Sequence, residues 1–154
     1  MKFITTALVG LSLFSFSAAR AQMAEPVRWS HSSEKISADE YKITFTAQID
    51  AGWFVYSQFL DGTNGPVKTS FAYDVNPGVE LKGNTQEVGQ KEEGYDPNFN
   101  MHIVKYKGLT QFIQHVKVKN PDLEALKAQV TYMTCNEFTC MPPRDVPFSV
   151  QLSK

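Results

Sequence analysis

Apolar and polar residues alternate along much of this chain, and alternation with a period of two is typical of half-buried β-strands. The clearest example is Tyr41 to Ile49, in which Tyr, Ile, Phe, Ala and Ile alternate with Lys, Thr, Thr and Gln. Further segments rich in β-branched and aromatic residues predict strands at 27–31, 53–58, 69–75, 102–106, 110–118, 129–133 and 146–152. The chain is therefore predicted to be built mainly from short strands.

Turn-forming residues separate these segments and indicate the fold class. Gly, Pro, Asn and Asp occur at 50–52, 61–66, 76–78, 107–108 and 120–121. Residues 121–128 alone are predicted to form a helical turn or two, with Asn120 placed to cap it. Many short strands with turns at these intervals are typical of an antiparallel sandwich, so we predict an all-β, immunoglobulin-like β-sandwich.

The first 21 residues have the pattern of a secretory signal peptide. Lys2 supplies a positive start, residues 3–19 are apolar or small, and Ala19-Arg20-Ala21 fits an A-x-A cleavage site. This apolar stretch is shorter than the roughly 20 residues of a spanning helix. No cysteine lies at the cleavage site to carry a lipid. We expect an exported protein that does not span the membrane, with a single domain over residues 22–154.

The charge balance and motifs exclude several function classes. Without the first 21 residues the chain has 13 basic and 16 acidic residues, a formal charge of −3. Nucleic-acid binding needs a basic face, and the lysines form no run, so nucleic acid is not an expected partner. The sequence also has no Ser/His/Asp arrangement, phosphate-binding glycine loop or metalloprotease motif.

Cys135 and Cys140 are the only cysteines in the chain and the strongest candidates for chemistry. An exported protein meets an oxidising compartment, which favours pairing, and four intervening residues are an ordinary hairpin connection. The bridge would close so short a loop that its chain-entropy stabilisation is only about 2 kcal/mol. Short, accessible bridges are also exchangeable. The residues alone thus leave open a structural bridge and a redox-active pair.

Two further function classes are considered. Soft sulfur and imidazole ligands suited to Cu(I) occur at Met101, His102, Met133, Cys135, Cys140 and Met141. Neither cysteine has a histidine at metal-ligand spacing, however, so no metal or other cofactor is expected. The other class is a β-sandwich interaction module with an inert bridge, because a sandwich fold alone does not settle function.

The chain resembles the amino-terminal periplasmic domain of the DsbD thiol:disulfide interchange proteins over nearly the whole mature length. The most specific matches are Val130-Thr131-Tyr132-Met133-Thr134-Cys135, Cys140 with Met141-Pro142-Pro143, and Gly52-Trp53-Phe54-Val55-Tyr56-Ser57. Family members commonly have one more residue between the cysteines than the four found here. The resemblance implies an immunoglobulin-like periplasmic domain, linked to cytochrome c biogenesis, whose cysteine pair relays reducing equivalents to oxidised periplasmic proteins.

The resemblance also implies partners. Full-length members carry a membrane conduit and a thioredoxin-like domain, and these 154 residues contain neither. We therefore expect a thioredoxin-like protein or a membrane electron conduit to act in trans as the reductant. By the same resemblance, Cys140 forms mixed disulfides with partners and Cys135 resolves them.

A cap loop over the cysteine pair is a further feature of the family, and residues 92–99 resemble it. Asp96 would be its acidic residue, and either Phe99 or Tyr95 its aromatic residue. An aromatic ring over the sulfurs excludes small oxidants, and a nearby carboxylate disfavours the thiolate. The alternative interpretation is a solvated acidic loop, since charged turns are usually exposed.

Tyr56 and Phe54 are expected to wall the site from the neighbouring strand. The period-two pattern is equally consistent with both residues belonging to the general core.

Overall fold

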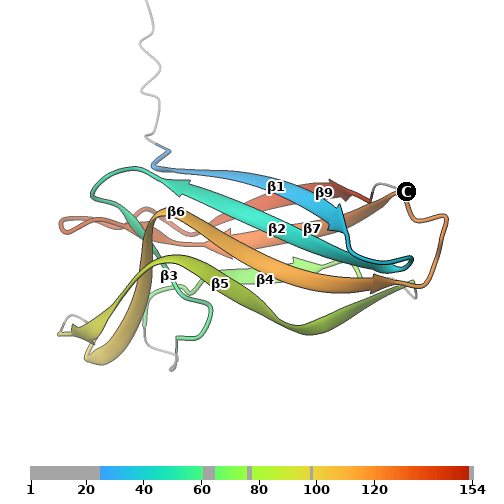
Figure 1. The fold of residues 1–154 in the computed structure, drawn as a ribbon. Helices are drawn as coiled ribbons and strands as arrows, with labels where there is room; N and C mark the ends of the chain where they lie inside the picture. Colours follow the sequence, from blue (N-terminus) through green and yellow to red (C-terminus); the bar gives the residue numbers. More distant parts are fainter. Residues whose placement is uncertain (1–24, 61–64, 76–77, 98, 153–154) are drawn as a thin grey trace, which may run out of the picture.

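The computed structural model describes residues 25–60, 65–75, 78–97 and 99–152, and these residues form two antiparallel β-sheets and no helix. The larger sheet contains β1 (Val27–Lys35), β2 (Glu40–Ile49), β3 (Phe54–Tyr56), β5 (Val79–Asp96), β6 (Met101–Val118) and β8 (Thr134–Cys135). The smaller sheet contains β4 (Ser70–Tyr73), β7 (Ala125–Tyr132) and β9 (Arg144–Gln151). Figure 1 shows the smaller sheet lying against one face of the larger sheet. The prediction of an all-β antiparallel sandwich is confirmed.

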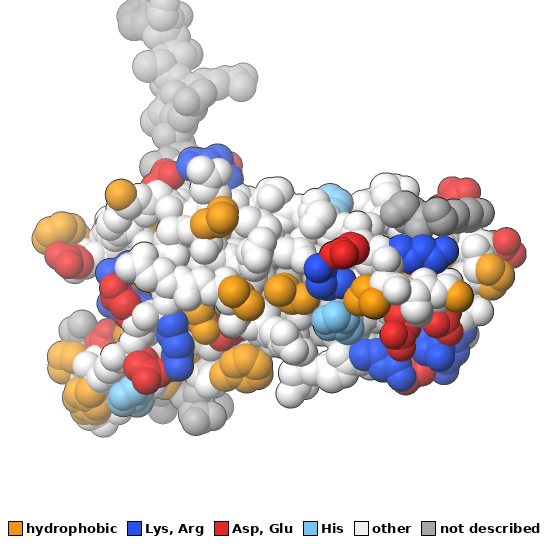
Figure 2. All heavy atoms as spheres, in the orientation of Figure 1, with side chains coloured by type: hydrophobic (Ala, Val, Ile, Leu, Met, Phe, Trp, Pro, Cys, Tyr) orange, Lys and Arg blue, Asp and Glu red, His pale blue; other side chains and the backbone are white. Residues whose placement is uncertain are grey.

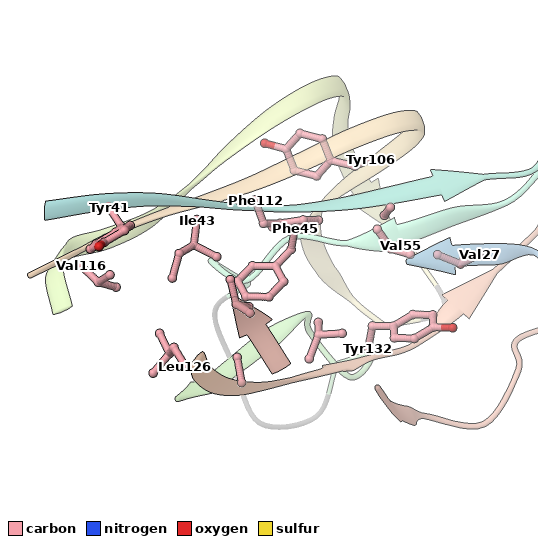
Figure 3. Close-up of a cluster of buried hydrophobic side chains, with 14 of the residues drawn as sticks. Val27, Tyr41, Ile43, Phe45, Val55, Tyr106, Phe112, Val116, Leu126 and Tyr132 are labelled. Atoms are coloured by element: carbon pink, nitrogen blue, oxygen red, sulfur yellow. The ribbon is translucent and has the colours of Figure 1, made fainter. Parts of the chain in front are cut away.

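The core lies between the two sheets and follows the sequence pattern. Within β2, Ile43 and Phe45 are fully buried, as the alternation in Tyr41 to Ile49 predicts. The Phe45 ring lies 5.0 Å from that of Phe148 on β9, so the contact joins the two sheets. Figure 3 shows Ile43 and Phe45 on one layer and Leu126 on the facing layer. Each such fully buried side chain stabilises the fold by about 1.5–3 kcal/mol.

The longest hairpin among the described residues, β5–β6, differs from the prediction. The sequence predicted two strands separated by a turn at Lys107-Gly108, whereas β6 is one strand of 18 residues. Gly108 has a φ of +62° and lies in a register shift of the β5–β6 ladder, so it forms a bulge instead of a turn. The strand β5 was not predicted, because most of its residues are polar and exposed.

At the bulge around Gly108, β6 changes the strand with which it pairs. From Leu109 to Lys117, β6 pairs with β2, whereas at Lys105 and Tyr106 it pairs with β3. The end of the β5–β6 hairpin therefore bends away from β2, at the left of Figure 1. This bend brings the hairpin end to β3 and β8, which carry the candidate site residues.

The predicted helical turn at 121–128 is wrong. The Asn120 side chain does accept a hydrogen bond from the backbone N–H of Asp122, at 3.0 Å, but within a turn. The chain enters β7 at Ala125, where burial alternates with a period of two and β9 supplies the pairing. Tertiary pairing overrides a weak local preference here.

The predicted signal peptide, residues 1–21, lies outside the described residues. Within the described ranges, no helix has the length and apolar character needed to cross a membrane.

Candidate thiol-disulfide site

The cysteine pair lies at the end of a hairpin, as its spacing predicts. Cys135 is the last residue of β8, and it is disulfide-bonded to Cys140 directly opposite in an antiparallel bridge, with Cα atoms 4.0 Å apart. The backbone N–H of Met141 donates to the carbonyl of Thr134 at 2.8 Å. The base of the hairpin is therefore held by backbone pairing as well as by the covalent bridge.

The two cysteines differ sharply in exposure. Cys135 is 1% exposed, because β8 pairs with β3 and places it opposite Phe54. The Thr134 hydroxyl donates to the carbonyl of Phe54 at 2.9 Å and fixes this pairing. Cys140, on the returning chain, is exposed. An incoming sulfur therefore meets Cys140 first.

Cys135 lies in a small apolar cluster separate from the main core. Its buried members are Phe54, Tyr56, Leu60, Ile103 and Cys135, and Met101, Val104 and Met133 pack against them. Such an environment disfavours a charged thiolate.

Tyr56 is the polar group in contact with the buried sulfur. Its hydroxyl donates a hydrogen bond to Sγ of Cys135 over 3.4 Å, and the residue is 2% exposed. Burial, and secondly the negative charge of Asp96, raises the pKa of Tyr56 to about 12. Tyr56 is therefore a protonated donor at neutral pH. Tyr56 was expected either to wall the site or to belong to the general core. The structure places it in the apolar cluster around Cys135 and in contact with the sulfur of that residue.

The residues predicted for the cap lie at the end of the β5–β6 hairpin. Glu92 to Asp96 belong to β5, so the connection between the strands is shorter than the predicted loop. Phe99, in this connection, is half-buried and packs edge-to-face on Tyr56 with ring centroids 6.5 Å apart. Asp96 is half-buried and close enough for its charge to act on Tyr56. Tyr95 points elsewhere: it is 63% exposed, and its hydroxyl donates to Asn100.

The structure thus brings together Cys135, Cys140, Tyr56, Asp96 and Phe99, and leaves Tyr95 outside the group. The ring that covers Tyr56 comes from the cap segment, and that segment reaches it only because β6 changes partner.

Sequence reasoning missed Glu87, which anchors the strand that carries Tyr56. The Glu87 carboxylate accepts hydrogen bonds from the Ser57 hydroxyl at 2.7 Å and the backbone N–H of Gln58 at 2.8 Å. Burial, with the charge and hydrogen bond of Glu87, raises the pKa of Tyr106 to about 12. Glu87 therefore ties the end of β3 to β5. No sequence signal marks it, since it is one acidic residue in a polar segment.

The Cu(I) hypothesis requires several ligands that meet at one point. In the part of the chain that the structure describes, no three His, Cys, Asp or Glu side chains converge on one point.

Comparison with known proteins identifies the family. The model of the family described as "Thiol:disulfide interchange protein DsbD, N-terminal" matches residues 20–152. No curated protein matches the chain. The DsbD amino-terminal domain of Neisseria meningitidis in its reduced form is 19% identical, with a TM-score of 0.54, over 84% of this chain and 87% of that one. The immunoglobulin-like fold predicted from the sequence is confirmed by this likeness.

Two other solved structures are similar. The amino-terminal periplasmic domain of ScsB from Proteus mirabilis is 16% identical, with a TM-score of 0.54, over 83% of this chain and 47% of that one. A chain from the complex between the DsbD and PilB amino-terminal domains of Neisseria meningitidis is 20% identical, with a TM-score of 0.48, over 77% and 80% of the two chains. Since the family model covers residues 20–152, this chain belongs to the family of DsbD amino-terminal domains, and its general role is in thiol-disulfide interchange.

Proposed function

We propose that this protein is a periplasmic thiol-disulfide exchange protein that relays reducing equivalents through Cys135 and Cys140. A thioredoxin-like protein or a membrane electron conduit, acting in trans, supplies the electrons, and oxidised exported proteins receive them. The observation that carries the proposal is the asymmetry of the pair: Cys140 is exposed, whereas Cys135 is 1% exposed beneath Tyr56.

Reduction of the protein begins at the exposed sulfur. A thiolate of the reduced partner attacks Sγ of Cys140, the bond to Cys135 breaks, and its electron pair leaves with the Cys135 sulfur. The mixed disulfide then joins the partner to Cys140. The partner's second thiolate attacks its own sulfur in that mixed disulfide, which releases reduced Cys140 and leaves the partner oxidised.

Transfer to a client repeats the same chemistry in the other direction. The Cys140 thiolate attacks the client disulfide and forms a mixed disulfide, and one client sulfur leaves as a thiolate. Cys135 then attacks Sγ of Cys140, which restores the bridge and releases the dithiol client. Two electrons have moved from the pair to the client.

Tyr56 and the cap residues support these steps. When Cys135 leaves as a thiolate in an apolar cluster, the Tyr56 hydroxyl is the donor placed to hydrogen-bond it, 3.4 Å away in the oxidised protein. Phe99 covers Tyr56 from the hairpin end, and Asp96 adds a negative charge that disfavours thiolates nearby. Together they shield the side of the pair where Cys135 lies, whereas Cys140 stays open to a partner.

A single-cysteine exchange assay tests the two roles. A thioredoxin that lacks its resolving cysteine is activated as a mixed disulfide with thionitrobenzoate and added to the reduced Cys135→Ala and Cys140→Ala variants. Cys135→Ala keeps the exposed thiol, so it displaces the coloured thionitrobenzoate and forms a stable conjugate. Cys140→Ala keeps only the buried thiol, and we expect its reaction to be at least about tenfold slower. Equal rates for the two variants would reject the assigned roles.

A further inference from the structure

Phe138 is an exposed aromatic residue in the same short turn as the reactive cysteine. It lies in the cysteine hairpin, two residues before Cys140, and its side chain is 92% exposed. Among the exposed large apolar side chains of the described residues, this fraction is the highest; the next is 65%, at Leu109. A fully exposed phenyl ring contributes little to the folded state, and aromatic rings of this kind are enriched at protein interfaces.

The backbone that presents Phe138 is held in place by hydrogen bonds. The Asn136 side-chain oxygen accepts from the backbone N–H groups of Phe138 at 2.9 Å and Thr139 at 2.8 Å. The backbone N–H of Asn136 donates to the carbonyl of Thr139 at 2.9 Å and closes the turn. None of these bonds involves sulfur, so none of them depends directly on the disulfide. A preorganised turn loses little conformational entropy when a partner binds.

A hollow of about 320 Å³ adjoins Phe138 on the side of β3 and β6. It is lined by Ala51 to Phe54, by Lys105 and Lys107, and by Asn136 to Phe138. The Lys105 ammonium lies 4.4 Å from the centre of the Phe54 ring. Figure 2 shows hydrophobic side chains among charged ones at this end of the molecule, the left end in the view. The hollow gives a partner a concave surface next to the projecting ring.

We propose that Phe138 and the adjoining hollow form the docking surface for the thioredoxin-like reductant, with the Phe138 ring packed on the apolar surface around that protein's reactive cysteine. The inference rests on the proposed function and adds the surface that selects the partner. A mixed disulfide at Cys140 holds the partner's sulfur about 2 Å from Sγ, which brings the partner's surface to the short turn that carries the Phe138 ring. A small thiol reaches the same sulfur without touching Phe138.

The difference in size between a small thiol and a protein reductant provides the test. The oxidised wild-type protein and Phe138→Ala are each reduced by a small thiol, dithiothreitol, and by reduced thioredoxin as the protein probe, and the two rate constants are measured. We expect Phe138→Ala to react with thioredoxin at least about tenfold more slowly, a change of about 1.4 kcal/mol in the barrier, with an unchanged dithiothreitol rate. Phe138→Leu retains apolar area and should recover most of the loss.

The matched control is Ile36→Ala, which removes another exposed apolar side chain, 51% exposed, from the turn between β1 and β2 at the far end of the sandwich. Its rates should equal the wild-type rates with both probes. If Phe138→Ala reacts normally with thioredoxin, or slows equally with both probes, the docking inference is overturned while the exchange function stands. If the wild-type bridge resists dithiothreitol as well as thioredoxin, the proposed function itself fails, and the docking inference fails with it.

Discussion

Reduction of the Cys135–Cys140 bridge should leave this domain folded, with only a modest loss of stability. The bridge closes a loop of only six residues, and the chain-entropy relation gives such a loop about 2 kcal/mol, against about 4.7 kcal/mol for a loop of a hundred residues. A structural staple would be expected to link distant parts of the chain. This bridge instead joins two positions that already face each other across a backbone pair.

The contacts around the bridge explain why the fold should survive its loss. The N–H of Met141 donates to the carbonyl of Thr134, and the Thr134 hydroxyl donates to the carbonyl of Phe54; neither bond involves a sulfur. Reduction gives buried Cys135 a free thiol, and a free thiol packs as a small apolar group. The stability difference should therefore stay close to the loop-closure term.

The difference is measured by urea unfolding of the protein with and without excess dithiothreitol, followed by tryptophan fluorescence. We expect the free energy of unfolding to fall by about 2 kcal/mol with an almost unchanged m-value. Cys140→Ser is the control, because it removes the bridge at an exposed position. It should match the reduced wild-type protein and should not respond to dithiothreitol. A loss above about 4 kcal/mol, or unfolding on reduction, would refute the reasoning and identify a structural bridge.

Two further predictions concern close packing on β5 and the burial of Tyr56. In Gly89→Ala, the new Cβ would lie 2.6 Å from Oγ1 of Thr110, which is fully buried, so we expect a loss of about 1–3 kcal/mol in urea unfolding. Gly94→Ala, where a Cβ meets open space on the same strand, should change stability far less, and equal losses would contradict the clash. Burial raises the pKa of Tyr56 to about 12 in the folded protein, above the ordinary tyrosine value of 10. The neutral form of Tyr56 therefore stabilises the fold fully below pH 10, and this stabilisation is lost as the pH rises through 12. Tyr56→Phe should remove up to about 3 kcal/mol of alkaline destabilisation, and unchanged alkaline unfolding would count against the buried phenol.

The strands with a buried face were predictable because their side chains carry the pattern. The alternation from Tyr41 to Ile49 places one set of side chains in the core, and the structure buries that set. β5 was not predictable in this way. Its backbone pairs with that of β6, and its side chains are mostly exposed, so a polar sequence is compatible with the strand.

Gly108 shows why local signals mislead at bends. A positive φ favours glycine in a turn and in a bulge alike, so the dipeptide Lys107-Gly108 does not distinguish between them. The choice depends on which strands lie beside β6, and that is a long-range property. Residues 121–128 were assigned to a helical turn for the same reason: the pairing of residues 125–128 with β9 is invisible in the local sequence.

The candidate site also has one part that the sequence predicts and another that depends on the fold. The spacing of Cys135 and Cys140 was enough to predict a bridged hairpin end, because four intervening residues constrain the geometry locally. Other features of the site arise only because β3, β6 and β8 meet in space. These features are the burial of Cys135 beside the exposed Cys140, the contact of Tyr56 with Cys135, and the packing of Phe99 on Tyr56. These contacts join residues distant in the chain, and only the folded sheet decides which of them meet.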